Sequence, residues 1–154
     1  MQQNYSHVMA GIRETIDREV PILQTTPESI LTERRNSQNR TIKQLLGHLV
    51  DSAANNHQRM VRLQYNPRLV FPDYTQDNDL WISLQDYQHA DWSDLIQLWK
   101  YYNLHIIQVI KSVDHSALEN DWEDFEGNRV TLHQMIEGYL GHLHLHINQI
   151  KELM

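Results

Sequence analysis

Four long stretches of this sequence repeat apolar residues at intervals of three and four, which is the spacing of a helix with one buried side. They cover about residues 5–23, 41–63, 91–114 and 131–153. In the first stretch these residues are Val8, Ile12, Ile16, Val20 and Leu23. A small hairpin around residues 125–130 is the only competing strand pattern. Four amphipathic helices that must bury their apolar sides against one another predict an all-α fold, a four-helix bundle.

Local signals give the expected helix boundaries. Thr41 and Gln44 have the spacing of a capping box, and Thr131 and Gln134 repeat it. The second and fourth long helices should therefore begin at these threonines. Pro21 lies inside the first stretch, where it predicts a kink or an early end of that helix, because proline lacks the backbone N–H that the helix needs.

The connection between the second and third long helices is expected to be a long loop. Pro67 stops the second helix, and a short helix over about residues 80–88 closes the loop. A loop of this length in a compact domain is often a lid or a binding loop. The acidic connection between the third and fourth long helices, residues 116–128, carries Trp122 and Phe125, which are expected to anchor it on the bundle.

Composition excludes several classes of function. The length of 154 residues fits one domain, residues 1–154, and the absence of cysteine excludes cysteine-ligated zinc and leaves thiol chemistry to a thiol from outside. The net charge of −7 argues against nucleic-acid and anionic-membrane partners, since both require a basic patch. No membrane span or signal peptide is found, so we expect a cytoplasmic protein. The basic residues of the first half are expected to form a solvated face: Arg34, Arg35, Arg40, Lys43, Arg59, Arg62 and Arg68.

Three of the ten histidines alternate within the last apolar stretch, at positions 142, 144 and 146. On a helix this spacing separates them, because His142 and His146 share one side whereas His144 points about 200° away from His142. The stretch therefore offers one pair of imidazoles on the buried side. A pair of this kind needs a third ligand from another helix to hold a metal ion tightly.

His48 on the second helix is the candidate for the third ligand. It begins a polar row that continues with Ser52, Asn55 and Arg59 on the inward side of that helix. A buried neutral imidazole needs a hydrogen-bond partner or a metal, and bundles build metal sites from side chains on facing helices. We therefore predict a metal site from His48 and the pair on the last helix. The alternative is three core histidines that are satisfied by hydrogen bonds.

The remaining histidines have simpler explanations. His7, His89 and His115 lie at element ends or in polar connections and should be exposed, and the helical positions of His57, His133 and His144 also place them on the surface. His105 follows Tyr102 by three residues on the third helix, so its side chain could line the core.

Two segments resemble the DinB superfamily and, within it, the YfiT-type branch of bacillithiol S-transferases. They are His48-Leu49-Val50-Asp51-Ser52, followed by Asn55 and Arg59, and Gly141-His142-x3-His146-Ile147-x2-Gln149-Ile150. The resemblance covers about residues 41–151. It implies a four-helix bundle of the DinB and YfiT-like type with a divalent metal, zinc or nickel, held by His48, His142 and His146. The segment from Tyr74 to Trp81 is also similar to an aromatic loop of the family, with its two aromatic residues farther apart.

The leading functional hypothesis is a metal-dependent transferase. Three neutral imidazoles leave coordination positions open, as in catalytic zinc sites. A low-molecular-weight thiol similar to bacillithiol would be activated there and would attack an electrophilic small molecule. Asn55 and Arg59 are candidates for holding anionic groups of the thiol, although Arg59 could equally pair with a carboxylate at the bundle end. Asp51 and Gln149 are candidates for orienting an imidazole through its second nitrogen.

Two other classes of function stay open on the sequence. A metal-dependent hydrolase would activate water at the same three-histidine site, and a non-catalytic bundle would only bind a metal or a small ligand. A homodimer is expected from the resemblance, because bundles of this family often pair. An exposed aromatic such as Trp92 could contribute to that contact.

Overall fold

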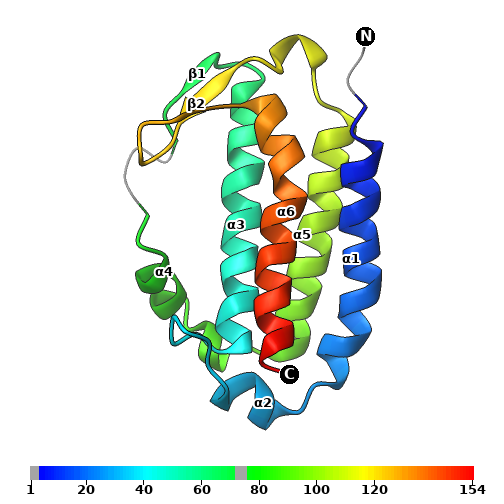
Figure 1. Ribbon diagram of the computed structural model, residues 1–154, viewed down its shortest axis with the longest axis vertical. Helices are drawn as coiled ribbons and strands as arrows, with labels where there is room; N and C mark the ends of the chain where they lie inside the picture. The colour runs from blue at the N-terminus through cyan, green and yellow to red at the C-terminus, as the bar shows by residue number, and fades with distance from the viewer. Residues whose placement is uncertain (1–3, 72–75) are drawn as a thin grey trace.

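Four long helices packed side by side form the protein, as a computed structural model shows for residues 4–71 and 76–154 (Figure 1). The long helices are α1 (Ser6–Thr25), α3 (Ile42–Leu63), α5 (Trp92–Lys111) and α6 (Leu132–Glu152). The short elements are α2 (Glu28–Glu33), β1 (Arg68–Leu69), α4 (Asn78–Leu84), the 3-10 helices η1 (Tyr87–His89) and η2 (His115–Ala117), β2 (Asp121–Glu123) and β3 (Arg129–Thr131). The predicted all-α four-helix bundle is confirmed.

The order of the helices around the bundle differs from their order in the chain. α1 and α3 each pack against both α5 and α6, so α1 and α3 lie diagonally across the bundle. α3 and α5 run in the same direction, so the chain between them, residues 64–91, must return along the length of α3 (Figure 1). This return segment carries α4 and η1, which makes the predicted long loop partly helical. Within the described parts of the chain, no helix has the length and hydropathy needed to cross a membrane.

Both predicted capping boxes form. The hydroxyl oxygens of Thr41 and Thr131 accept the backbone N–H groups of Gln44 and Gln134 at 3.3 and 3.1 Å. The glutamine side chains accept the threonine backbone N–H groups in return, at 3.0 and 2.9 Å. Each box therefore satisfies two donors that a helix start leaves without an intrahelical partner. α3 and α6 begin within one residue of the predicted positions.

The expectation that Pro21 kinks or ends the first helix is wrong about the end, because α1 continues to Thr25. The ring of Pro21 is exposed, so the missing N–H costs one hydrogen bond and creates no packing conflict in the core. Beyond it, Leu23 is buried and holds the last turn on the bundle. The hydroxyl groups of Thr25 and Thr26 also donate to the carbonyl oxygens of Pro21 and Ile22 at 3.1 and 2.8 Å.

A three-stranded sheet covers one end of the bundle. β2 and β3 form a hairpin where the sequence had its only competing strand pattern, and β1 adds to β2 in parallel, with Leu69 opposite Trp122. Trp122 is half-buried, as expected of an anchor. Phe125 is 75% exposed, so its expected role as an anchor is wrong. It lies in the turn between β2 and β3, beside the bundle.

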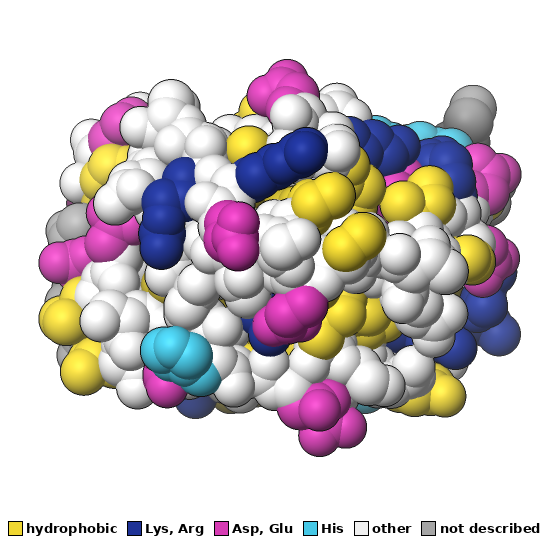
Figure 2. All heavy atoms as spheres, turned by 90° about the horizontal axis from the view of Figure 1, so that it is seen from below, with side chains coloured by type: hydrophobic (Ala, Val, Ile, Leu, Met, Phe, Trp, Pro, Cys, Tyr) yellow, Lys and Arg dark blue, Asp and Glu magenta, His cyan; other side chains and the backbone are white. Residues whose placement is uncertain are grey.

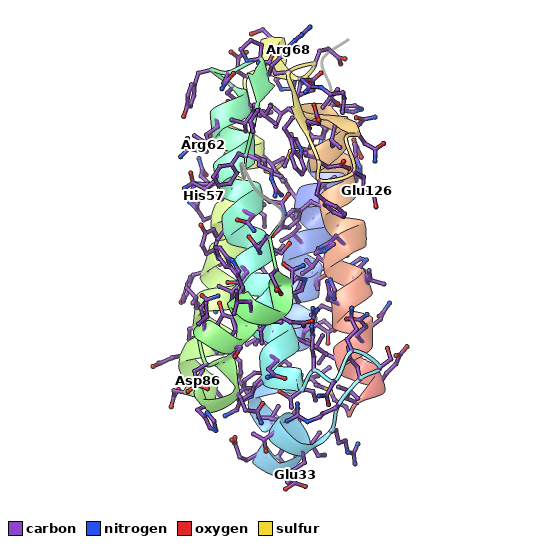
Figure 3. All side chains as sticks on the ribbon, turned by 90° about the vertical axis from the view of Figure 1, so that its left-hand side faces the viewer. Glu33, His57, Arg62, Arg68, Asp86 and Glu126 are labelled. Carbon is purple, nitrogen blue, oxygen red and sulfur yellow. The ribbon has the colours of Figure 1, made fainter. Side chains whose placement is uncertain are left out.

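Charged side chains are more varied in burial than the sequence suggested. Arg40 and Lys43 are buried, with 8% and 5% of their surface exposed, which corrects the expectation that they belong to a solvated face. Each has a carboxylate partner, Asp79 at 2.9 Å and Glu28 at 2.8 Å, respectively. Elsewhere acidic and basic side chains are interspersed on the surface, as the face in Figure 2 shows. Arg68, an exposed member of the basic group, lies at one end of the elongated molecule (Figure 3).

Candidate metal centre

Three histidines from α3 and α6 meet between these neighbouring helices. His48, His142 and His146 each offer one ring nitrogen, and the three nitrogens lie within 4.8 Å of one another. The ring centroids of His48 and His142 lie 4.7 and 4.6 Å from that of His146. His142 and His146 are one turn apart on α6, and α3 brings His48 opposite them. The structure thus brings together the residues that the sequence nominated as metal ligands.

The three imidazoles differ in their access to solvent. His48 and His146 are buried, with 8% and 7% of their surface exposed, whereas His142 is exposed and lines the pocket described below. Desolvation by burial, together with the neighbouring histidines, lowers the pKa of His48 to about 3 and that of His142 to about 4. Burial also lowers the pKa of His146. All three rings are therefore neutral at pH 7, the state in which a histidine binds a metal ion.

Hydrogen bonds show how the residues present fit a divalent ion. The side-chain oxygen of Gln149 lies 2.8 Å from Nδ1 of His146, which leaves Nε2 of that ring as the free acceptor. Nδ1 of His142 lies 3.4 Å from the hydroxyl of Ser52. Nδ1 of His48 is buried and has no hydrogen-bond partner among the described residues. A buried ring nitrogen without a partner, inside a group of three neutral imidazoles, fits a metal site better than three satisfied core histidines.

Asp51 does not orient an imidazole, so that expectation is wrong. Its buried carboxylate accepts hydrogen bonds from the hydroxyl of Tyr87 at 2.7 Å and the side-chain amide of Gln85 at 2.9 Å. Burial raises the pKa of Asp51. Asp51 follows His48 by three residues on α3, and its side chain contacts the return segment. Its hydrogen bonds hold that segment against α3. Gln149, the other candidate, is in contact with His146 as predicted.

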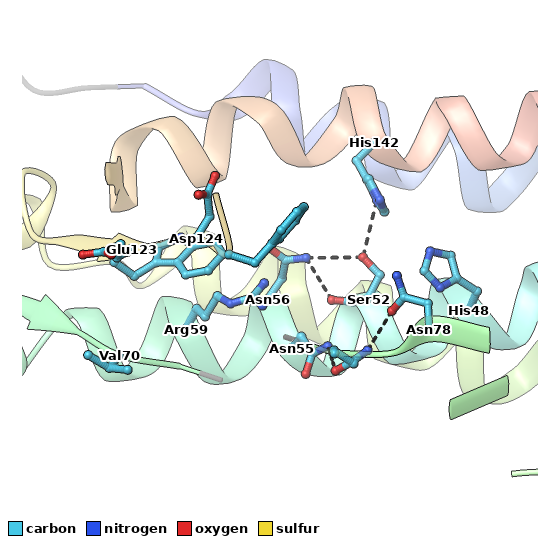
Figure 4. A pocket seen from close by; sticks show the side chains of 13 residues that line it. His48, Ser52, Asn55, Asn56, Arg59, Val70, Asn78, Glu123, Asp124 and His142 are labelled. Carbon is cyan, nitrogen blue, oxygen red and sulfur yellow. Dashed lines mark hydrogen bonds between the residues drawn. The ribbon is translucent and has the colours of Figure 1, made fainter. Parts of the chain in front are cut away.

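A pocket of about 600 Å³ opens beside the three histidines (Figure 4). Its walls come from α3, α6, the return segment and the hairpin: His48, Ser52, Asn55, Asn56, Arg59, Val70, Gln76, Asn78, Trp122, Glu123, Asp124, Phe125 and His142. Both candidate binding residues, Asn55 and Arg59, lie in this pocket. The side-chain amide of Asn55 donates to Gln76 at 2.9 Å, which ties the return segment to this wall. Gln76 and Asn78 were missed because only the fold brings the return segment against α3. Asn56 lies on α3 itself, one turn after Ser52, so its helical spacing could have found it.

Arg59 does not pair with a carboxylate in the described parts of the chain, in contrast to one of the two expectations for it. Its Nε donates to the backbone oxygen of Phe71 at 3.0 Å. The guanidinium lies over the ring of Trp122, 4.0 Å from its centroid. Burial lowers the pKa of Arg59 to about 10, so the side chain stays charged at pH 7.

Several histidines that were expected on the surface are half-buried between helices. The hydroxyl of Thr15 lies 2.9 Å from Nε2 of His144, the hydroxyl of Tyr102 lies 3.0 Å from Nδ1 of His57, and the hydroxyl of Tyr5 lies 2.8 Å from Nδ1 of His133. His115 is half-buried as well and stacks on Tyr5. His7 and His89 are exposed as predicted. His105 is exposed and packs edge-on against His57, away from the three-histidine group.

Two further expectations concern aromatic residues. Trp92 is half-buried, and its indole N–H donates to the backbone oxygen of Leu23 at 2.8 Å. This contact corrects the expectation of an exposed ring, because Trp92 begins α5 where that helix packs on α1. Tyr74, the first residue of the expected aromatic loop, lies outside the described residues, and Trp81 lies in α4.

Comparisons with known proteins agree with this geometry. The family model described as the DinB superfamily matches residues 12–150. A solved structure described as YfiT from Bacillus subtilis, "a probable metal-dependent hydrolase with an unusual four-helix bundle topology", superposes with a TM-score of 0.84. The two sequences are 19% identical, and the match covers 97% of this chain and 85% of that chain. The curated proteins contain no match. At this identity the likeness to YfiT concerns the fold.

Proposed function

The chain belongs to the DinB superfamily, and from this premise we propose that it is a metal-dependent enzyme whose His48, His142 and His146 hold zinc or nickel. The observation that carries the proposal is the group of three neutral imidazoles at the wall of a pocket large enough for a small molecule. Three such ligands leave a coordination position open. A divalent ion held there would lower the pKa of a bound thiol or water and supply a nucleophile near neutral pH.

We propose a low-molecular-weight thiol similar to bacillithiol as the cosubstrate and an electrophilic small molecule as its target. The chain has no cysteine, so a sulfur nucleophile must come from a bound molecule. Asn55 and Arg59 line the same pocket as His48 and His142 and are placed to bind polar and anionic groups of that molecule. Gln149 holds the ring of His146 in one orientation, which keeps the site ready for the ion.

A metal-dependent hydrolase is the second candidate, and the description of YfiT as a probable metal-dependent hydrolase favours it. In that case water would take the place of the thiol at the same open position. A non-catalytic bundle that only binds a metal or a small ligand is the third. These candidates share the three-histidine group and differ in what the pocket turns over.

The first experiment is elemental analysis of protein purified without a histidine tag, before and after incubation with zinc or nickel. We expect one ion per chain, lost in His48→Ala and retained in the control His105→Ala, which removes an exposed histidine outside the group. The second is turnover of chlorodinitrobenzene and nitrophenyl acetate, each with and without bacillithiol. Thiol-dependent loss of chloride supports the transferase, whereas ester cleavage without thiol would replace it by the hydrolase. An empty protein after metal addition would refute all metal-dependent candidates.

A homodimer and a cytoplasmic location stay predictions. Sedimentation equilibrium of the metal-loaded protein tests the first, and fractionation of the source cells tests the second. A partner in the form of nucleic acid or a membrane surface is not expected, given the net charge of −7.

A further inference from the structure

Arg59 carries a half-buried positive charge that forms no salt bridge among the described residues. Glu123 and Asp124 line the same pocket, but their carboxylates contact Arg129 and Asn128 instead. The buried Arg40 has the carboxylate of Asp79 at 2.9 Å, whereas Arg59 has only the backbone oxygen of Phe71 as a hydrogen-bond acceptor. The N–H groups at the end of the Arg59 side chain have no acceptor among residues 4–71 and 76–154. Burying a charge without a counter-ion is unfavourable, and such a charge in a pocket is a ready site for an anion.

The ring of Trp122 fixes the position of this guanidinium by stacking. The centroid of the ring lies 4.0 Å from the central carbon of the guanidinium. The hydrogen bond from Nε to the backbone oxygen of Phe71 fixes one edge of the guanidinium plane. A guanidinium that is fixed by stacking presents its remaining donors in one plane, which suits the two oxygens of a carboxylate. Both residues line the pocket that contains His48 and His142.

Arg59 and His48 lie on one side of α3 at opposite ends of the pocket. Eleven residues make about three turns, so both side chains face the same way and their backbones are about 16 Å apart along the axis. Ser52, Asn55 and Asn56 lie between them (Figure 4). Side chains on a helix lean toward its N-terminus, and the side chain of Arg59 is longer than that of His48, so the guanidinium lies about 10–16 Å from the histidines.

We propose that Arg59, seated on Trp122, is the anion subsite of this pocket, and that the substrate is an elongated thiol whose carboxylate binds there while its sulfur reaches the three histidines. This inference rests on the proposed function for the sulfur end only. The distance between Arg59 and the three histidines then selects substrates by length, because a molecule must be long enough to contact both. Short thiols, and long thiols without an anionic group, bind one end and lose the contribution of the other.

The test uses the cobalt-substituted protein, because a sulfur ligand gives cobalt a charge-transfer absorption that reports binding without turnover. The probes are mercaptooctanoate, the uncharged mercaptooctanol of the same length, and the short mercaptoacetate. We expect mercaptooctanoate to bind about 10- to 100-fold more tightly than mercaptooctanol, which is the range for one hydrogen-bonded charged pair. Mercaptoacetate should show no such advantage.

Arg59→Gln should abolish the preference for the carboxylate, and Arg59→Lys should restore part of it. The control is Arg13→Gln, which removes an exposed charge from α1, away from the pocket, and should keep the full preference. Equal binding of mercaptooctanoate and mercaptooctanol by the wild type, or an unchanged preference in Arg59→Gln, would overturn the inference.

A second measurement separates the anion subsite from the metal chemistry. Octanoate, which has no sulfur, is titrated calorimetrically into the metal-free protein. Binding by the wild type that is at least tenfold weaker in Arg59→Gln supports the subsite, even if no thiol changes the cobalt spectrum and the proposed function fails. No difference in octanoate affinity between the wild type and Arg59→Gln would refute the subsite, even if thiols reach the cobalt.

Discussion

Acid should destabilise the metal-free protein through the three-histidine group, and His48 gives the sharpest test. Burial lowers the pKa of His48 from 6.5 to about 3 in the folded protein. Above pH 6.5 the ring is neutral in both the folded and the unfolded chain, so its contribution to stability is complete. As the pH falls from 6.5 toward about 3, only the unfolded chain takes up the proton, and the folded state loses stability.

The size of the effect follows from proton linkage. One histidine that stays neutral only in the folded state lowers the free energy of unfolding by about 1.4 kcal/mol per pH unit below its unfolded pKa. At pH 5 this amounts to about 2 kcal/mol for His48, a sizeable part of the roughly 5–15 kcal/mol that stabilises a typical domain. The lowered pKa values of His142 and His146 act in the same direction and steepen the total dependence.

The assay is urea denaturation with a chelator present at several pH values between 7 and 5. The His48→Gln variant should have a free energy of unfolding whose slope against pH is smaller than that of the wild type, by about 1 kcal/mol per unit averaged over this range and by about 1.4 kcal/mol per unit at its acid end. The slope is compared because the substitution also changes packing at every pH. His89→Gln, which alters an exposed ring, serves as the control and should keep the wild-type slope. Equal slopes for His48→Gln and the wild type would refute the reasoning.

Three further predictions concern the metal and the packing around it. Zinc at a hundred times its Kd should add about 2.7 kcal/mol to the free energy of unfolding and raise Tm by roughly 5–10 °C in calorimetry, whereas His142→Ala should lose this rise. Gln149→Leu should weaken zinc binding about 10- to 100-fold in competition with a chelator, and unchanged affinity would show that Gln149 does not orient His146. Gly47→Ala should cost about 1–3 kcal/mol in urea denaturation, because the new methyl group would lie 2.2 Å from the ring of Tyr87, and wild-type stability would contradict this clash.

Much of the bundle could be predicted because its determinants are local in sequence. The capping boxes at Thr41 and Thr131 use residues three positions apart, and both helices begin there. Pro21 misled the prediction because its cost depends on where the ring points and on what holds the following turn. The pairing of β1 with β2 joins Leu69 to Trp122, and no local pattern announces a contact between such distant segments.

The histidines show how far helical spacing can be used. It correctly separated His144 from the pair on α6, but it placed His57 and His144 in solvent. Each long helix of this bundle contacts two neighbours, so a residue turned away from one apolar stripe can face a second helix. Thr15 on α1 and Tyr102 on α5 occupy these second faces. Their hydrogen bonds depend on the order of the helices around the bundle, which periodicity within one helix does not contain.

The metal group joins α3 to α6, and this has a consequence for the order of events during synthesis. His48 leaves the ribosome long before His142 and His146, so loading of an ion must wait until α6 has been made and has docked. Once bound, the ion would hold α6 against α3. Amide hydrogen exchange in α6 should then be slower in the loaded protein than in the empty one, which turns the final helix into a reporter of maturation.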